Sequence, residues 1–174
     1  KWAHHFEQTN DSIQILAWGT VMSRIVHVVG TGTIGEPLIG LLCHLKDQLG
    51  IDEVTFNKRS PNLTDRSKVK TLLDRGAKLS TAEDTISGFE KIGIRPSFVT
   101  RDAIERSSVV IDCTPSGAGL TNKEEYYQTA SGVKGFVAQG SEFGFGKMYA
   151  RGINDDALIP GKDRYLHVVS CNTH

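Results

Sequence analysis

Short apolar runs alternate along this chain with segments of helical periodicity. Residues 24–29 (RIVHVV) form a β-branched run, and leucine and isoleucine then recur at helical spacing from Leu38 to Leu49, up to Gly50, a residue type that commonly ends helices. The same pattern predicts strands at residues 53–56, 96–99, 108–112, 135–139 and 165–170, and helices at residues 65–75, 81–92, 101–106 and 123–130. Apolar strands separated by helices indicate an α/β fold with a doubly wound, mostly parallel sheet.

Composition excludes several classes of protein. The chain has 174 residues, the length of one domain, with 20 Lys and Arg against 20 Asp and Glu. Because the net charge is zero, we expect neither nucleic acid nor a membrane as a partner, and no apolar stretch approaches the ~20 residues of a membrane span. The three cysteines, Cys43, Cys113 and Cys171, are too far apart for a zinc motif or a disulfide framework. We therefore expect no metal site and a cytoplasmic location.

The two ends differ from the middle of the chain. The chain starts at Lys1 and its first methionine is Met22, so we interpret residues 1–22 as an N-terminal extension. The alternative is a short helix over residues 12–18 that packs on the domain or on a neighbouring chain. Residues 23–170 are predicted to form the folded domain, and residues 171–174 to begin a truncated second domain.

A glycine-rich loop directly follows the first predicted strand and opens the first predicted helix. GxGxxG alone is a weak signal, but in this context it indicates a Rossmann-type dinucleotide-binding domain. The first glycine permits a tight turn, the second a close approach to a pyrophosphate, and the third close helix–strand packing. The alternative is a loop whose glycines serve geometry alone, and Glu36 suits a pyrophosphate only if its side chain turns outward. The predicted loop residues are Gly30, Gly32, Thr33, Ile34 and Gly35.

The end of the second strand bears on the choice of cofactor. NAD-specific sites place a carboxylate there to bind the ribose hydroxyls, but this chain has Asn57, Lys58, Arg59 and Ser60. Two cations and a hydroxyl suit a 2′-phosphate, so we expect NADP to be preferred, with NAD as the second choice. The alternative is a solvated basic turn.

The last motif is a cysteine that follows the final predicted strand. Cys171 is followed by polar residues, so it is predicted to lie in a loop at the sheet edge where doubly wound folds bind ligands. Cys43, in an apolar helical segment, is instead interpreted as a buried apolar residue.

Several motifs in order resemble those of the archaeal-type (type II) glyceraldehyde-3-phosphate dehydrogenases. They are GTGTIG, NKRSP, IDCTPSGAG followed by TNKEEYY, AQGSEFG and VVSCNT, and they extend from Arg24 to Thr173. The resemblance implies an N-terminal NAD(P)-binding Rossmann domain followed by a catalytic domain, in a cytoplasmic homotetramer that uses NADP or NAD. The chain departs from the family at Glu36 and Pro37, where basic residues are usual.

The resemblance also implies a role for individual residues. Cys171 matches the catalytic nucleophile, Asn172 the neighbour that helps to hold the oxyanion, and Ser170 and Thr173 residues near the substrate phosphate. Cofactor binding is implied for the glycine loop, for Lys58, Arg59 and Ser60, for Thr114 and Pro115 in the cleft, and for Gln139 and Gly140 nearby.

The implied reaction is oxidation of glyceraldehyde 3-phosphate through a cysteine thioester that inorganic phosphate cleaves. The family's general base, a histidine of the second domain, lies beyond residue 174, and His174 does not match it. We therefore expect the chain to be the NAD(P)-binding half of a homo-oligomeric enzyme, inactive by itself.

Two alternatives remain. One is a dinucleotide-binding module without chemistry, in which Cys171 is structural. The other is a different Rossmann oxidoreductase, such as a relative of aspartate-semialdehyde dehydrogenase or dihydrodipicolinate reductase.

Overall fold

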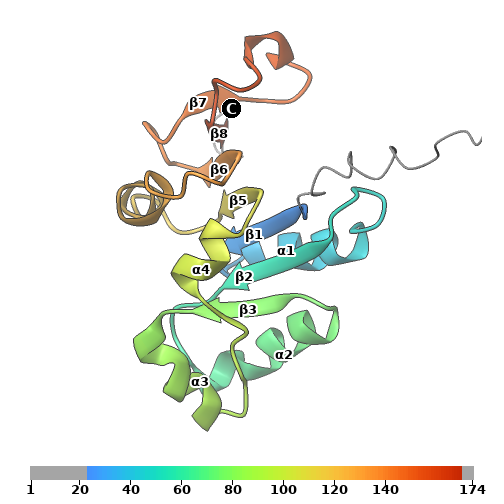
Figure 1. Ribbon diagram of the computed structural model, residues 1–174, viewed down its shortest axis with the longest axis vertical. Helices are drawn as coiled ribbons and strands as arrows, with labels where there is room; N and C mark the ends of the chain where they lie inside the picture. Colours follow the sequence, from blue (N-terminus) through green and yellow to red (C-terminus); the bar gives the residue numbers. More distant parts are fainter. Residues whose placement is uncertain (1–22, 170–174) are drawn as a thin grey trace, which may run out of the picture.

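A computed structural model describes residues 23–169 of the chain. They form a single eight-stranded sheet with the strand order β4-β3-β2-β1-β5-β6-β8-β7, and every pair of neighbouring strands is parallel. Figure 1 shows these strands fanning out from β3 to β7. The predicted doubly wound, Rossmann-like α/β fold is confirmed.

The elements follow one another in strand–helix alternation. The strands are β1 (Ile25–Val29), β2 (Glu53–Asn57), β3 (Lys78–Thr81), β4 (Phe98–Val99), β5 (Val109–Asp112), β6 (Gly135–Gly140), β7 (Lys147–Tyr149) and β8 (Tyr165–Val169). The helices are α1 (Gly35–His44), α2 (Arg66–Asp74), α3 (Ile86–Lys91), α4 (Thr100–Glu105) and α5 (Ala118–Asn122), the last continued by a π-helical turn, η3 (Lys123–Tyr127). Single 3₁₀ turns are η1 (Leu63–Asp65), η2 (Glu83–Thr85) and η4 (Asp155–Ala157).

Two strands differ from the prediction. The helix expected over residues 81–92 begins only at Ile86, and the buried Thr81 belongs to β3, which the sequence pattern did not reveal. β3 has one large apolar residue, Leu79, and its polar residues Ser80 and Thr81 are buried because hydrogen bonds satisfy them: the hydroxyl of Ser80 donates to the carbonyl of Phe56 at 3.2 Å. β7 was also missed, because its sequence Lys-Met-Tyr has no apolar pattern.

Two helices have different limits from those predicted. α1 ends at His44, and residues 45–50 turn back towards β2 through Gly50, whose φ is +61°. Leu49, expected on the apolar helix face, is therefore 53% exposed. The helix predicted over residues 123–130 starts earlier, at Ala118, because Gly117 adopts a φ of +85° and begins the turn there.

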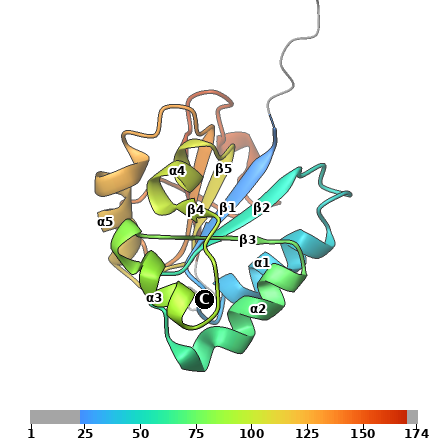
Figure 2. The same cartoon turned by 60° about the horizontal axis from the view of Figure 1, so that its bottom comes forward.

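The helices form two layers, one on each side of the sheet. α1, α2 and α3 cover one face, where Ile39, Leu72 and Phe89 pack on Val28 and Phe56. α4, α5 and η3 lie on the other side, where Ile104 and Tyr127 pack with Val110 and Phe136 (Figure 2). None of the helices within residues 23–169 has the length and apolar character needed to cross a membrane.

Candidate cofactor cleft

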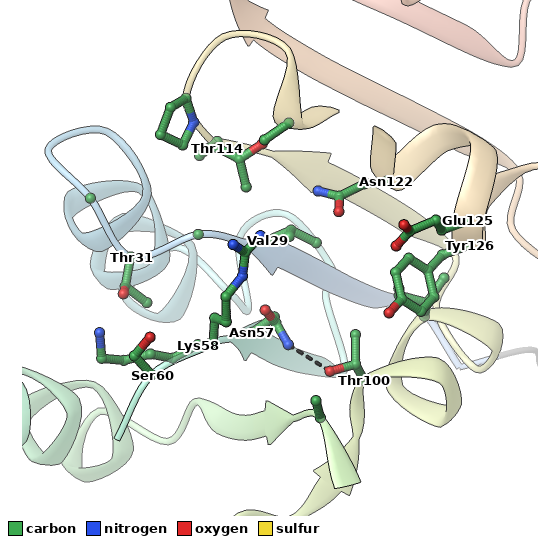
Figure 3. Close-up of a pocket in the computed structure, with 18 of the residues that line it drawn as sticks. Val29, Thr31, Asn57, Lys58, Ser60, Thr100, Thr114, Asn122, Glu125 and Tyr126 are labelled. Carbon is green, nitrogen blue, oxygen red and sulfur yellow. Dashed lines mark hydrogen bonds between the residues drawn. The ribbon is translucent and has the colours of Figure 1, made fainter. Parts of the chain in front are cut away.

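A cleft of about 1010 Å³ opens at the carboxyl ends of β1, β2 and β5. This is the place where a doubly wound sheet changes winding direction and where such folds bind ligands. The structure brings together ten of the residues predicted from the sequence (Figure 3). They are Gly30, Gly32, Thr33, Ile34, Lys58, Arg59, Ser60, Thr114, Pro115 and Gln139. Gly35 and Gly140 are not part of the wall.

Each glycine of the loop meets a different steric demand. Gly30 has a φ of +97°, a conformation that side chains disfavour, and a Cβ there would lie 3.1 Å from the carbonyl oxygen of Cys113. A Cβ on Gly35 would lie 2.0 Å from the carbonyl oxygen of Gly30, so helix α1 can approach the turn only with glycine at this position. Nothing lies within 4 Å of a Cβ built on Gly32, which lines the cleft. Gly30 and Gly35 are therefore required by the geometry of the turn, whereas at Gly32 no side chain covers the backbone that faces the cleft.

Glu36 does not compete with an anion at this loop. Its carboxylate lies 3.4 Å from Nζ of Lys68 on α2, and the residue does not line the cleft. The outward orientation that the sequence required for a pyrophosphate site is therefore present.

The two cations that follow β2 have different surroundings. Nζ of Lys58 lies 2.8 Å from Oδ2 of Asp65 in η1, and the Lys58 side chain is only 12% exposed. Arg59 is exposed and takes part in none of the ion pairs found within residues 23–169. Asp84 of η2 also lines the cleft, so the structure adds a carboxylate that the sequence did not place there.

Other residues of the wall come from elements that are distant in the sequence. Nδ2 of Asn57 donates to the hydroxyl of Thr100 at 2.7 Å, which ties the end of β2 to the start of α4. Figure 3 shows this pair on the same side as Lys58 and Ser60, facing Thr114. Asn122, Glu125 and Tyr126 complete the wall. Asn122, Glu125 and Tyr126 belong to the TNKEEYY segment, but the sequence alone did not place their side chains at the cleft, because the fold brings this segment to the ends of β1 and β2.

The loop after β5 is fixed by the buried carboxylate of Asp112. Asp112 accepts hydrogen bonds from the backbone N–H of Thr114 at 2.9 Å, from the Thr114 hydroxyl, from Asn122 at 2.9 Å and from the Tyr127 hydroxyl at 2.6 Å. Burial, together with Asp112, raises the pKa of Tyr127 well above its ordinary value, so this hydroxyl stays a donor. Asp112 thereby joins the Thr114–Pro115 segment to α5 and η3 and gives the cleft a rigid wall.

The described cysteines are not suited to nucleophilic chemistry. Burial, and secondarily Asp112, raises the pKa of Cys113 to about 12, and burial also raises the pKa of Cys43. The predicted nucleophile Cys171 and its neighbours Ser170, Asn172 and Thr173 lie outside the described residues. β8, which precedes them, pairs with β6 as far as Val169 opposite Gly140, at the edge of the sheet that carries the cleft. Three or more metal-ligating side chains do not cluster anywhere in residues 23–169.

The fold and the cleft define a Rossmann-like α/β domain with a glycine turn at its ligand-binding edge. Comparison with models of known protein families finds no match. The chain is 34% identical over 152 residues to the glyceraldehyde-3-phosphate dehydrogenase of Pyrobaculum neutrophilum, 35% over 150 residues to that of Methanobacterium bryantii, and 33% over 153 residues to that of Sulfurisphaera tokodaii. These matches cover 85–86% of this chain but only 40–42% of each relative. The chain spans about 40% of the length of these archaeal relatives, and over that length it is similar to them.

Proposed function

We propose that the chain is the NAD(P)-binding half of a phosphorylating glyceraldehyde-3-phosphate dehydrogenase, which in its complete form is a cytoplasmic homo-oligomer. The observation that carries the proposal is the cleft with its three-glycine turn, in a homologue of these enzymes. Gly30 and Gly35 have no room for a side chain, whereas Gly32 has room for one and lacks it, as expected where a ligand approaches the backbone.

A nicotinamide dinucleotide fits the groups that line the cleft. The glycine loop and the start of α1 at Gly35 would hold the pyrophosphate through backbone N–H groups. The turn at Lys58, Arg59 and Ser60 would hold the adenosine end, and Thr114, Pro115 and Gln139 the nicotinamide end, with Gly140 next to Gln139 outside the wall. When bound, this cofactor supplies the acceptor for a hydride.

NADP is proposed as the preferred cofactor. Arg59 and Ser60 are exposed at the cleft, and a guanidinium binds phosphate with strong, charge-assisted hydrogen bonds. Asp84, on the same wall, acts against a large preference, because a carboxylate repels a phosphate and can accept from ribose hydroxyls.

Catalysis is proposed for the complete enzyme. The thiolate of Cys171 forms a bond with the aldehyde carbon of glyceraldehyde 3-phosphate, Asn172 holds the resulting oxyanion, and Ser170 and Thr173 bind near the phosphate. Once that carbon has been oxidised to a thioester, inorganic phosphate displaces the thiolate and releases an acyl phosphate. We assign the general base, which takes the hydroxyl proton, to the part of the relatives' sequences that this chain does not cover. General acid–base assistance is worth about 10²–10⁴-fold, so we expect no turnover from the 174 residues alone.

Calorimetric titration with NADP and NAD tests the cofactor proposal. Gly32→Val should lower the affinity for both cofactors by at least about tenfold without lowering the melting temperature, because the added side chain enters the cleft and its Cβ has no protein atom within 4 Å. Gly132→Val is the matched control, since Gly132 is exposed, lies away from the cleft and is equally free of a positive φ. Unchanged binding in Gly32→Val, or no binding of either cofactor to the parent chain, would contradict the proposal.

Alkylation with iodoacetamide tests the role of Cys171 and separates an enzyme from a binding module without chemistry. Cys171 should react faster than Cys43 and Cys113, because burial raises the pKa of both of those thiols and leaves less of the reactive thiolate. Peptide mass spectrometry at pH 7.5 gives the three rates. If Cys171 reacts no faster than the other two, the nucleophile assignment fails.

A further inference from the structure

The backbone of Lys58 is held in place by hydrogen bonds, whereas its side chain can change its anionic partner. Its N–H donates to the carbonyl of Ser80 at 3.1 Å, and its carbonyl accepts from the hydroxyl of Thr81 at 2.9 Å. These bonds tie the residue to the end of β3, so its Cα cannot shift without breaking the sheet edge. Only the flexible side chain is free to exchange one anionic partner for another.

Asp65 is the partner that the structure provides. Oδ2 of Asp65 lies 2.8 Å from Nζ of Lys58 and accepts a second, longer hydrogen bond from Nδ2 of Asn62 at 3.4 Å. The hydrogen bond from Lys58 is the main reason why the pKa of Asp65 is lowered, so the carboxylate stays charged at neutral pH. The ammonium is largely enclosed, with the side chain 12% exposed, whereas Asp65 is 31% exposed. Lys58 is thus held by a full negative charge beside the wall of the cleft.

The neighbouring cation lacks such a partner. Arg59 is exposed on the cleft, and the carboxylate on the same wall, Asp84, forms no ion pair with it. The sequence has two cations at this turn, Lys58 and Arg59. Of these, only Arg59 has no carboxylate partner among the described residues. An ammonium that is already paired either gives up that pair or keeps the carboxylate next to the phosphate, and in both cases its contribution to phosphate binding is reduced.

We propose that Asp65 is a specificity-determining residue that acts through Lys58: it holds the ammonium in an ion pair and so limits the preference of the cleft for a dinucleotide with a 2′-phosphate. This inference rests on the proposed dinucleotide function. It assigns the NADP preference of the parent chain mainly to Arg59 and predicts a latent, larger preference that appears when the charge of Asp65 is removed.

Titration of four proteins with NADP and NAD tests the inference. Asp65→Asn should raise the affinity for NADP about three- to tenfold, the range for release of one partly exposed ion pair to a charge-assisted phosphate contact. The affinity for NAD should change less than about twofold, because NAD has no 2′-phosphate. Lys58→Met in the parent background should lower the NADP affinity by less than Asp65→Asn raises it, because the paired ammonium contributes only part of its charge, and Lys58→Met combined with Asp65→Asn should lose the whole gain. This double-mutant cycle shows whether Asp65 acts through Lys58.

Two controls keep the result interpretable. Asp74→Asn removes a carboxylate from the far end of α2, away from the cleft, and should leave the ratio of the two affinities unchanged. Asp65→Ser removes the same charge with a different side chain and replaces Asp65→Asn if that variant does not fold. An unchanged NADP-to-NAD ratio in the Asp65 variant, or a gain that persists without Lys58, overturns this inference while leaving the dinucleotide site intact. Failure of the parent chain to bind either cofactor overturns the proposed function itself.

Discussion

The two halves of the sheet are covered differently. In the half that contains β1, β2 and β3, residues on both faces are buried, for example Val28 and Val29 in β1 and Leu79 and Ser80 in β3. In the half that contains β5, β6 and β8, burial alternates. Val110 and Phe136 are buried under α4 and η3, whereas the apolar residues of the opposite face are half-buried or exposed. Those residues are Val109, Ile111, Val137, Leu166 and Val168.

The difference separates the two ends of the cleft. The glycine turn and the residues after β2 belong to the half that buries both faces, so the proposed pyrophosphate and adenosine sites stand on a complete core. The proposed nicotinamide side stands on the other half. That half relies on one face with stacked aromatic rings, Tyr127 on Phe136 at 4.8 Å and Phe136 on Tyr165 at 5.1 Å. Parallel sheets are usually covered on both faces. Among the described residues, however, no helix covers the outer face of β6 and β8, the face opposite α4 and η3 that carries Val137 and Leu166.

A matched pair of leucine substitutions should show the largest contrast. Leu79→Ala in β3 should lower the free energy of unfolding by about 3–5 kcal/mol, because Leu79 is fully buried and leaves a cavity. Leu166→Ala in β8 should cost less than half of that, because its side chain is only half-buried and water can fill the space. Urea unfolding of both variants gives the two values. Equal losses would show that the face of β8 is as well covered as β3.

The completely buried His27 of β1 should make stability depend on pH. Desolvation lowers its pKa from 6.5 to about 3, so the unfolded chain takes up a proton below pH 6.5 that the folded chain does not bind. The free energy of unfolding therefore falls as the pH drops below 6.5, by about 2 kcal/mol between pH 7 and pH 5.

His27→Asn tests this assignment. Asparagine cannot titrate and keeps a polar group near the Thr55 hydroxyl, which lies 2.7 Å from Nδ1 of His27. The variant should show a nearly flat stability between pH 7 and pH 5, whatever its absolute stability. The carboxylates with lowered pKa values, such as Glu53 and Asp65, lose their contribution only at lower pH, and so do not interfere. A slope that survives in His27→Asn would place the titrating group elsewhere.

The same contrast separates what the sequence predicted from what it did not. The glycine loop and the end of β2 were predicted because their chemistry lies in consecutive residues, and the structure places them on one cleft. β3 was missed because its polar residues Ser80 and Thr81 are buried, with hydrogen bonds to Phe56 of β2 and to Lys58 just after it, and no periodicity encodes such bonds. Asp65 was missed as the partner of Lys58, and Asp84 as part of the cleft wall, because tertiary folding brings them there. Local patterns therefore predicted the loop, and only the packing of distant elements showed its charge balance.

The smallest effect is expected on the outer face of β8. Val168→Thr replaces a methyl group by a hydroxyl at a side chain that is 38% exposed, so water can solvate the hydroxyl and the cost should stay within about 0.5 kcal/mol. The same change at the buried Val54 of β2 should cost about 1–3 kcal/mol, because the hydroxyl enters an apolar core without a ready partner. Thermal unfolding of both variants, at two protein concentrations, measures the difference. A cost at Val168 as large as that at Val54 would mean that this face is covered in solution, and a cost that grows with protein concentration would identify a second copy of the chain as the cover.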